Sequence, residues 1–381
     1  MTHATGRPGS LMAGSPSGQA RGGPRGSWRR SSRGSAGKAI DPQVHPPSPA
    51  GRRLTIDIHA HMIVPEVVAL VRDQFDPARD PFLRFGGVST EYNERLAPRL
   101  VPLLTDPALR LATMDRQGVR YQAVSIAPPQ YHYWAEPDLG TAIARIQNDA
   151  IAALVAAHPS RIVGLGTLPM QAPDRAVLEL DRVVSQHGFA GVSLNPSAEG
   201  HDYDEPAYEA FWQRVEELDV VVVLHPNGFP SGERLTRYYM INVVGNPLET
   251  TVALTHVILG GVLERHPRLK IVAVHGGGYL PVYMDRMDHA YDCRPEVRER
   301  ITRKPSDYVK QLYFDSVVFG DGLRTLIDRV GADHVVMGTD YPFDMGEPDP
   351  LGRIAEVTNV SDEERQLMTG LTAARLLRLS G

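Results

Sequence analysis

The 381-residue sequence predicts an α/β fold, and the (β/α)8 or TIM barrel fits it best. From Leu54 onward, short apolar runs alternate with amphipathic segments, as in parallel sheets whose strands are joined by helices. The run at 220–224 is continuous and mostly β-branched, which is typical of a parallel strand covered on both faces. A doubly wound open sheet shares this alternation and stays an alternative at this point. No repeat of fixed period is visible, which excludes a solenoid.

The apolar runs predict eight strands, the number that closes such a barrel. They span residues 54–58, 122–126, 162–165, 189–194, 220–224, 271–274, 312–314 and 335–337. Apolar residues that recur with helical spacing predict helices at 173–186, from Asp204 through Leu218, at 248–264 and at 323–330. Gly188 suits the C-cap of the first helix, and Asp204 suits the N-cap of the second.

Composition narrows the class of partner. A formal net charge of −5 provides no footprint for nucleic acid, so we expect a small-molecule ligand. The single cysteine, Cys293, has no partner for an internal disulfide, which fits a cytoplasmic protein. No run approaches the roughly 18 to 20 apolar residues that a membrane span requires.

Residues 1–52 differ from the rest of the chain. Gly, Ser, Pro and Arg dominate there, and almost nothing could pack into a core. We therefore expect a disordered basic tail at 1–52 and one catalytic domain at 53–381. Arg29-Arg30 raises the alternative of a twin-arginine export signal, but Ser31, Ser32, Arg33 and Gly34 follow where an apolar region is required.

Histidines and an aspartate stand where predicted strands end. His59 and His61 close the first strand, and their two-residue spacing in an extended chain points both imidazoles to the same side. His225 and His275 directly follow two other strands, and Asp340 comes three residues after the last. Barrels of this type build their active sites at the carboxyl ends of the strands. Scattered core or surface histidines would not repeat this placement at four strand ends.

Imidazoles and a carboxylate predict a divalent-metal site. The donors suit Zn²⁺ best, with Mn²⁺, Fe²⁺ and Co²⁺ as alternatives. Four protein ligands at most leave room for water or substrate. The fourth predicted strand, 189–194, contains no lysine that could become a bridging carbamate, so we expect one metal ion and not two.

Five segments carry a resemblance to a known family. The segments are Asp-Ile-His-Ala-His at 57–61, Met-Asp-Arg-Gln-Gly at 114–118, Val-Gly-Leu-Gly-Thr-Leu-Pro-Met-Gln-Ala-Pro at 163–173, His-Gly-Gly-Gly-Tyr-Leu-Pro at 275–281 and Gly-Thr-Asp-Tyr-Pro-Phe at 338–343. With these segments, the chain from Ile56 onward resembles the amidohydrolase-related decarboxylases of the metal-dependent hydrolase superfamily. The resemblance implies a barrel, a mononuclear metal site, a homodimer and non-oxidative loss of CO₂ from an unsaturated or aromatic acid.

The resemblance also implies roles for single residues. By position, His59, His61, His225 and Asp340 correspond to the metal ligands. His275 corresponds to the base that takes a proton from water at the metal, which suits a neutral imidazole. Asp340 would in addition deliver or orient a proton on the substrate carbon.

Two arginines match carboxylate-binding positions of the family. Arg286 corresponds to a residue that reaches the partner subunit's site, although a solvated helix charge is its alternative reading. Arg99 corresponds to a second one, with Arg95 as a competitor. After Pro226 the chain has Asn227-Gly228-Phe229 where the family places a tryptophan that lines the substrate pocket. The resemblance therefore leaves the identity of the substrate open.

Together these observations predict a metal-dependent decarboxylase of a small carboxylated semialdehyde or hydroxylated aromatic acid. The alternative is a hydrolase of a lactone or amide, because the same metal chemistry attacks a carbonyl. A catalytically inactive binding protein is a third hypothesis, which the complete set of ligand positions disfavours.

Overall fold

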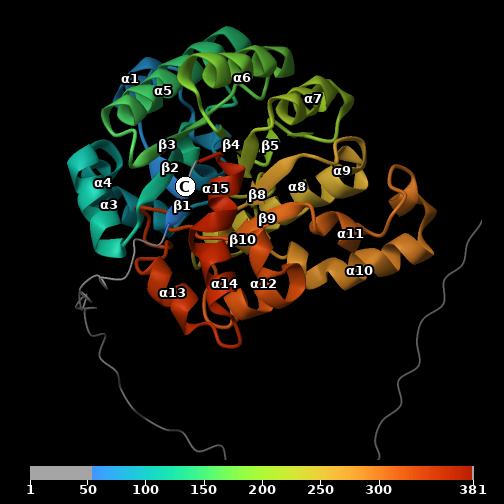
Figure 1. Ribbon diagram of the computed structural model, residues 1–381. Helices are drawn as coiled ribbons and strands as arrows, with labels where there is room; N and C mark the ends of the chain where they lie inside the picture. Colours follow the sequence, from blue (N-terminus) through green and yellow to red (C-terminus); the bar gives the residue numbers. More distant parts are fainter. Residues whose placement is uncertain (1–53, 380–381) are drawn as a thin grey trace, which may run out of the picture. The chain divides into compact units, whose positions relative to one another are not determined.

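The computed structural model describes residues 54–379, and these form a barrel of eight parallel strands with helices outside it (Figure 1). The strands pair in the order of the sequence, without the reversal of a doubly wound sheet. They are β1 (Ile56–Met62), β2 (Tyr121–Ile126), β3 (Ile162–Gly166), β4 (Gly191–Leu194), β7 (Val221–Leu224), β8 (Lys270–Ala273), β9 (Leu312–Asp315) and β10 (Val335–Val336). The predicted fold class is confirmed. The tail predicted at 1–52 lies outside the described residues.

The segment after β10 closes the barrel against β1. The amide of Ile58 donates to the carbonyl of Met337 at 2.9 Å, and the amide of His61 donates to that of Tyr341, also at 2.9 Å. Ala60 and Tyr341 form a parallel bridge. First and last strands therefore meet, which excludes the open sheet.

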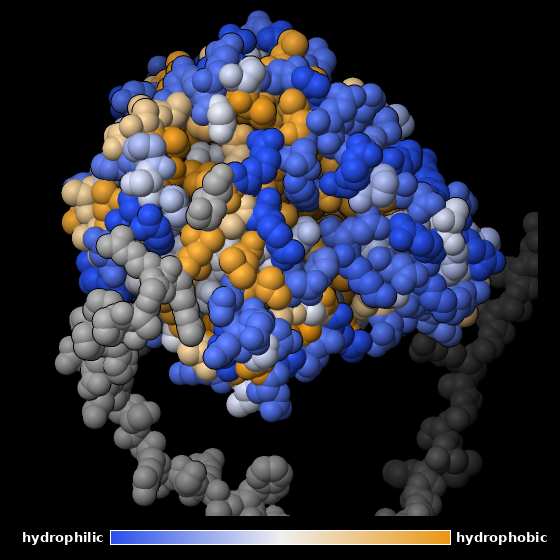
Figure 2. Space-filling model, in the orientation of Figure 1, coloured by the Kyte–Doolittle hydropathy of each residue, from blue (hydrophilic) through white to orange (hydrophobic). Residues whose placement is uncertain are grey.

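Successive side chains of a strand point to opposite faces of the sheet, which divides the core into an inner and an outer layer. In β7, Val221 and Val223 pack with the barrel interior, whereas Val222 and Leu224 pack against the surrounding helices. Helix α15 (Thr372–Leu376) joins the interior layer and contacts β1 and β10. Figure 2, drawn from the side on which α15 lies, shows apolar residues near the centre of this face, beside α15, and hydrophilic residues around them.

Helices at the predicted positions follow β3, β4, β7 and β9. Helix α6 (Pro173–His187) ends at Gly188, which has a left-handed φ of 67°, as its prediction as C-cap requires. Helix α12 spans Gly322–Val330. Among the described residues the remaining helices are α1 (Pro65–Val71), α2 (Pro81–Arg84), α3 (Val88–Thr105), α4 (Pro107–Gln117), α5 (Pro137–Ala157), α7 (Glu209–Leu218), α8 (Asn246–Leu259), α9 (Val262–Arg265), α10 (Leu280–Cys293), α11 (Pro305–Val309), α13 (Pro350–Glu356) and α14 (Asp362–Gln366).

Two helix predictions were wrong in detail. The helix expected at 248–264 is split into α8 and α9, because Gly261 adopts a left-handed φ of 77° that interrupts the helix. Asp204 does not cap a helix. Its carboxylate instead lies 3.0 Å from Nδ1 of His256, and the next helical turn begins at Pro206 without a side-chain cap.

Four helices that were not predicted, α1 to α4, lie between β1 and β2. Helix α3 carries Pro98 and Pro102 in its interior, which are unfavourable there because proline lacks the amide hydrogen. A short hairpin of β5 (Ser197–Ala198) and β6 (His201–Asp202) follows β4. No helix among residues 54–379 is long and apolar enough to cross a membrane.

Candidate metal centre

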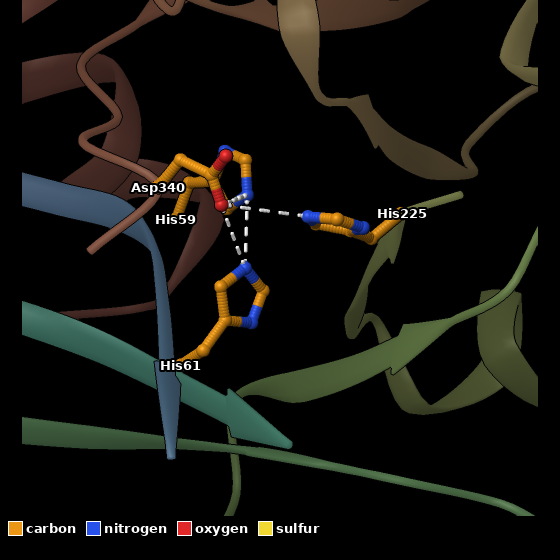
Figure 3. Close-up of side chains that lie close together, drawn as sticks. All are labelled: His59, His61, His225 and Asp340. Carbon is orange, nitrogen blue, oxygen red and sulfur yellow. Dashed lines mark hydrogen bonds and ion pairs between the residues drawn. The ribbon is translucent and has the colours of Figure 1, made fainter. Parts of the chain in front are cut away.

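Four side chains from three parts of the barrel meet at its carboxyl end (Figure 3). His59 and His61 lie on β1, His225 directly follows β7, and Asp340 lies on the segment after β10. One ligand atom of each lies within 4.8 Å of those of the other three, and all four residues are buried. An irregular register between Asp57 and Ala60 helps to arrange β1, because such a bulge changes which face the following residues occupy.

The spacing of these atoms fits a shared ion. Nε2 of His59 lies 3.1 Å from Nε2 of His61, and both lie 3.1 Å from Oδ1 of Asp340. Nε2 of His225 lies 3.7 Å from the same oxygen. Ligands bind zinc at about 2.0 to 2.2 Å, so two ligands of one tetrahedral ion are about 3.3 to 3.6 Å apart, close to these separations. The structure therefore brings the four predicted ligands into a group that fits one divalent metal ion.

In each of the three histidines, Nε2 faces the shared point and Nδ1 lies within hydrogen-bonding distance of another residue. Nδ1 of His59 lies 2.6 Å from Oδ2 of Asp315, Nδ1 of His61 lies 3.2 Å from the Ser125 hydroxyl, and Nδ1 of His225 lies 2.8 Å from the carbonyl of Pro226. Such partners fix the tautomer and present Nε2 to a metal. Nε2 of His225 is buried without a hydrogen-bond partner among the described residues, as a nitrogen reserved for an ion would be.

Electrostatics favour a cation at this point. Burial lowers the pKa of His61 to about 4, and it holds the pKa of His225 well below its usual range. Burial acts in the same direction on His59, but Asp340 and Asp315 outweigh it and raise the pKa of His59 to about 10. Burial would raise the pKa of Asp340, yet His59 and the neighbouring histidines hold it well below its usual range. In the metal-free protein a proton therefore stands on His59, where a divalent ion would replace it.

His275 lies beside this group and does not belong to it. Its Nε2 is 3.5 Å from Oδ2 of Asp340, the oxygen that faces away from His59 and His61. Its ring centre is 5.3 Å from that of His59 and 5.1 Å from that of His225. His275 and Asp340 both have left-handed backbones, with φ of 53° and 56°. Strain of this kind is often kept at functional sites.

A buried network that the sequence analysis missed supports β1. Asp57 accepts hydrogen bonds from the Thr339 hydroxyl at 2.6 Å, from Gln122 Nε2 at 2.8 Å and from the amides of His59 and Thr339 at 3.0 Å. Arg110 of α4 donates to Gln122 at 2.7 Å and to the carbonyl of His61. Asp57 stands within the predicted histidine motif, so its position in the sequence was a usable signal.

Asp315 was also missed, although a signal was present. It directly follows the predicted strand at 312–314, which is the same strand-end position that identified His225 and His275. Its Oδ2 faces His59, and its Oδ1 accepts from the amides of Gly276 at 2.9 Å and Val317 at 3.2 Å. One carboxylate thus links a candidate ligand to the loop that carries His275.

The two predicted substrate arginines are exposed on helices. Arg286 is exposed on α10, and Arg99 is exposed on α3, as is its competitor Arg95. Neither Arg286 nor Arg99 forms a hydrogen bond or ion pair with another residue of 54–379. Their assignment to a substrate carboxylate stays a prediction.

An eight-stranded parallel barrel with a buried His₃Asp group at its carboxyl end defines the protein as a (β/α)8 metal-site barrel. The chain belongs to the amidohydrolase family, whose model matches residues 56–379. It is 32% identical over 276 residues to 2-amino-3-carboxymuconate-6-semialdehyde decarboxylase of Dictyostelium discoideum, with 72% of this chain and 77% of the relative covered.

Two further relatives are decarboxylases of aromatic acids. Gamma-resorcylate decarboxylase of a Rhizobium species is 31% identical over 311 residues, with 78% of this chain and 93% of the relative covered. The crystal structure of a dihydroxybenzoic acid decarboxylase from Polaromonas, with bound manganese and the inhibitor 2-nitroresorcinol, has a TM-score of 0.72 at 26% identity. The alignment covers 86% of this chain and 97% of that one.

Proposed function

We propose that the protein is a metal-dependent carboxy-lyase that removes CO₂, without oxidation, from a small unsaturated or aromatic carboxylic acid. The observation that carries the proposal is the His₃Asp group with His275 placed against Asp340. The family membership and the decarboxylases among the relatives support it. These relatives act on both proposed kinds of acid, so they leave the choice between them open.

We propose one divalent ion, held by His59, His61, His225 and Asp340. Three imidazoles and one carboxylate suit Zn²⁺, and the manganese in the Polaromonas relative makes Mn²⁺ its main competitor. β4 contains no lysine that could form a bridging carbamate, which supports a single ion. Metal analysis of the purified protein would test both the identity and the stoichiometry.

The residues of the site divide the chemistry between them. When bound, the ion would supply Lewis acidity, which polarises an oxygen of the substrate. His275 would act as a base that takes a proton from water at Nε2, and Oδ2 of Asp340 would orient this proton toward the substrate carbon that bears the carboxylate. As that proton bonds to the carbon, the bond to the carboxyl carbon breaks and its electron pair stays on the substrate. CO₂ then leaves, and no organic cofactor is consumed.

We also propose that the enzyme is a cytoplasmic homodimer in which Arg286 holds a substrate carboxylate of the partner subunit. Arg286 is exposed on α10 beside Val282 and Tyr283, which are 52% and 60% exposed. Large apolar side chains that surround an arginine are typical of protein interfaces. Arg99, exposed on α3, is proposed as a second carboxylate contact. Sedimentation of the purified protein would test the dimer.

A substrate screen tests the activity. Carboxylated catechols, resorcinols and muconate semialdehydes should release CO₂ with the metal-loaded protein, and the His275→Ala variant should not accelerate this release. The same site could instead direct water onto a carbonyl. If the protein opens lactone rings and releases no CO₂ from any acid in the panel, its activity is that of a hydrolase and not of a lyase.

A further inference from the structure

A cavity of about 310 Å³, here called the rim pocket, opens at the carboxyl end of the barrel. Its walls come from residues 78–85 and from the loops that follow β2, β4 and β7. These loops follow strands whose carboxyl ends face the metal centre, so both features lie at the same end of the barrel. Asn227 lines the pocket and stands two residues after His225 in the chain.

Three residues that line the rim pocket carry buried polar atoms with no hydrogen-bond partner within residues 54–379. These atoms are Nδ1 and Nε2 of His132, Nε1 of Trp134 and Oδ1 of Asn195. His132 and Trp134 are only 8% and 9% exposed as residues, and both line the pocket. An unpaired buried polar group costs about 1 to 3 kcal/mol. Such a cluster at one cavity therefore indicates a ligand that pairs with these atoms.

The backbone of His132 supports the same conclusion. It has a left-handed φ of 49°, which is uncommon for a residue other than glycine. The imidazole packs edge-on against Trp134, with ring centres 5.5 Å apart. Burial lowers the pKa of His132 to about 4, so the ring is neutral at neutral pH. A neutral imidazole offers one N–H donor and one acceptor, whereas the Trp134 indole offers only a donor.

The charges around the rim pocket balance. Nη2 of Arg79 lies 2.9 Å from the Glu199 carboxylate, and both residues line the cavity. Asp80 accepts from Asn227 at 2.9 Å and adds a buried negative charge to the wall. Arg84 is the second lining cation and lies 3.9 Å from Glu233. Arg79 and Arg84 already lie against Glu199 and Glu233, so they would attract a ligand carboxylate only weakly. Asp80 would also repel such a carboxylate.

We propose that the rim pocket binds the part of the substrate remote from the departing carboxylate, and that this part is an uncharged, hydroxylated aromatic ring. The inference rests on the proposed decarboxylase. A hydroxyl both donates and accepts, so it satisfies the His132 imidazole together with either Trp134 or Asn195. The cavity lies at the small end of the usual range for ligand sites, which suits a single ring. The pocket thus favours hydroxylated aromatic acids over dicarboxylic acids.

Three matched probes test this choice by calorimetry with the metal-loaded full-length protein. Benzoate, 3-hydroxybenzoate and isophthalate share one ring carboxylate and differ only in the second substituent. We expect 3-hydroxybenzoate to bind about tenfold more tightly than the other two, which corresponds to about one net hydrogen bond. His132→Phe keeps the ring packing and should abolish this preference, so that benzoate and 3-hydroxybenzoate bind with similar affinity. His289→Phe, an exposed histidine on α10, is the control and should keep the preference.

A second measurement does not require turnover. The chain has three tryptophans, Trp28, Trp134 and Trp212, so fluorotryptophan labelling gives three assignable resonances. 3-Hydroxybenzoate should shift only the Trp134 resonance. A shift without CO₂ release from any acid would support the rim pocket and refute the decarboxylase. Tighter binding of isophthalate, or a Trp134 resonance that stays unchanged under saturating ligand, would overturn the rim pocket even if the protein proves to be a decarboxylase.

Discussion

Asp315→Asn should weaken metal binding, although Asp315 is not one of the proposed metal ligands. Its carboxylate accepts from His59 through Oδ2 and from the amides of Gly276 and Val317 through Oδ1. An asparagine of the same shape has only one acceptor oxygen. If its NH₂ faces Nδ1 of His59, the imidazole changes tautomer and its Nε2 carries a hydrogen toward the metal. If its NH₂ faces Gly276, that amide is left unpaired beside His275.

Loss of such a partner typically reduces metal affinity about tenfold to a hundredfold, or about 1.4 to 2.8 kcal/mol. Competition with a chromophoric chelator at neutral pH would measure the dissociation constant. The control is Asp328→Asn, because Asp328 is exposed on α12 and pairs with Arg324. An affinity of the Asp315 variant within twofold of wild type would refute the reasoning, and so would an equal loss in the control.

Three further predictions concern the ligands, the proton and the tail. The His225→Ala variant should bind less than one metal ion per chain, whereas the His275→Ala variant should keep its metal and lose about 10²- to 10⁴-fold in kcat. Equal loss of metal in both variants would show that His275 is another ligand. Because the pKa of His59 is about 10 without metal, binding should release about one proton and affinity should rise about tenfold per pH unit below that value. Calorimetry in buffers of different ionisation enthalpy measures this proton release. Metal binding without any proton release would be inconsistent with a protonated His59. Deletion of the residues before Gly51 should leave turnover within a few-fold of wild type in a steady-state assay.

The strands and the strand-end histidines were predictable because one physical constraint determines both. A strand that is buried on both faces must be apolar throughout, so 220–224 stands out in the sequence, and the polar residue that follows must lie at the barrel's carboxyl end. Chain order around the barrel then brings His225 to the histidines of β1. The closing of the barrel depends on backbone hydrogen bonds of Ile58 and His61, which the sequence cannot display.

Helix α3 escaped prediction because local signals there oppose the outcome. Pro98 and Pro102 argue against a helix, yet α3 runs through both. Asp204 shows the converse failure. It is a good N-cap residue with a proline two positions later, but the imidazole of His256, which is 52 residues away, lies against its carboxylate. Side chains that pair over such distances leave no trace in a short window of sequence.

The metal centre and the rim pocket also differ in how far the sequence predicts them. The candidate metal ligands are positioned by the closed barrel, with His59 and His61 on β1 itself and His225 one residue beyond β7. The rim pocket is built from loops, and its orphaned nitrogens at His132 and Trp134 become visible only when every neighbouring partner is known. Loops accept substitution more readily than buried strands do. Changes in the rim pocket should therefore alter which acid is bound while the metal and the proton chemistry stay the same.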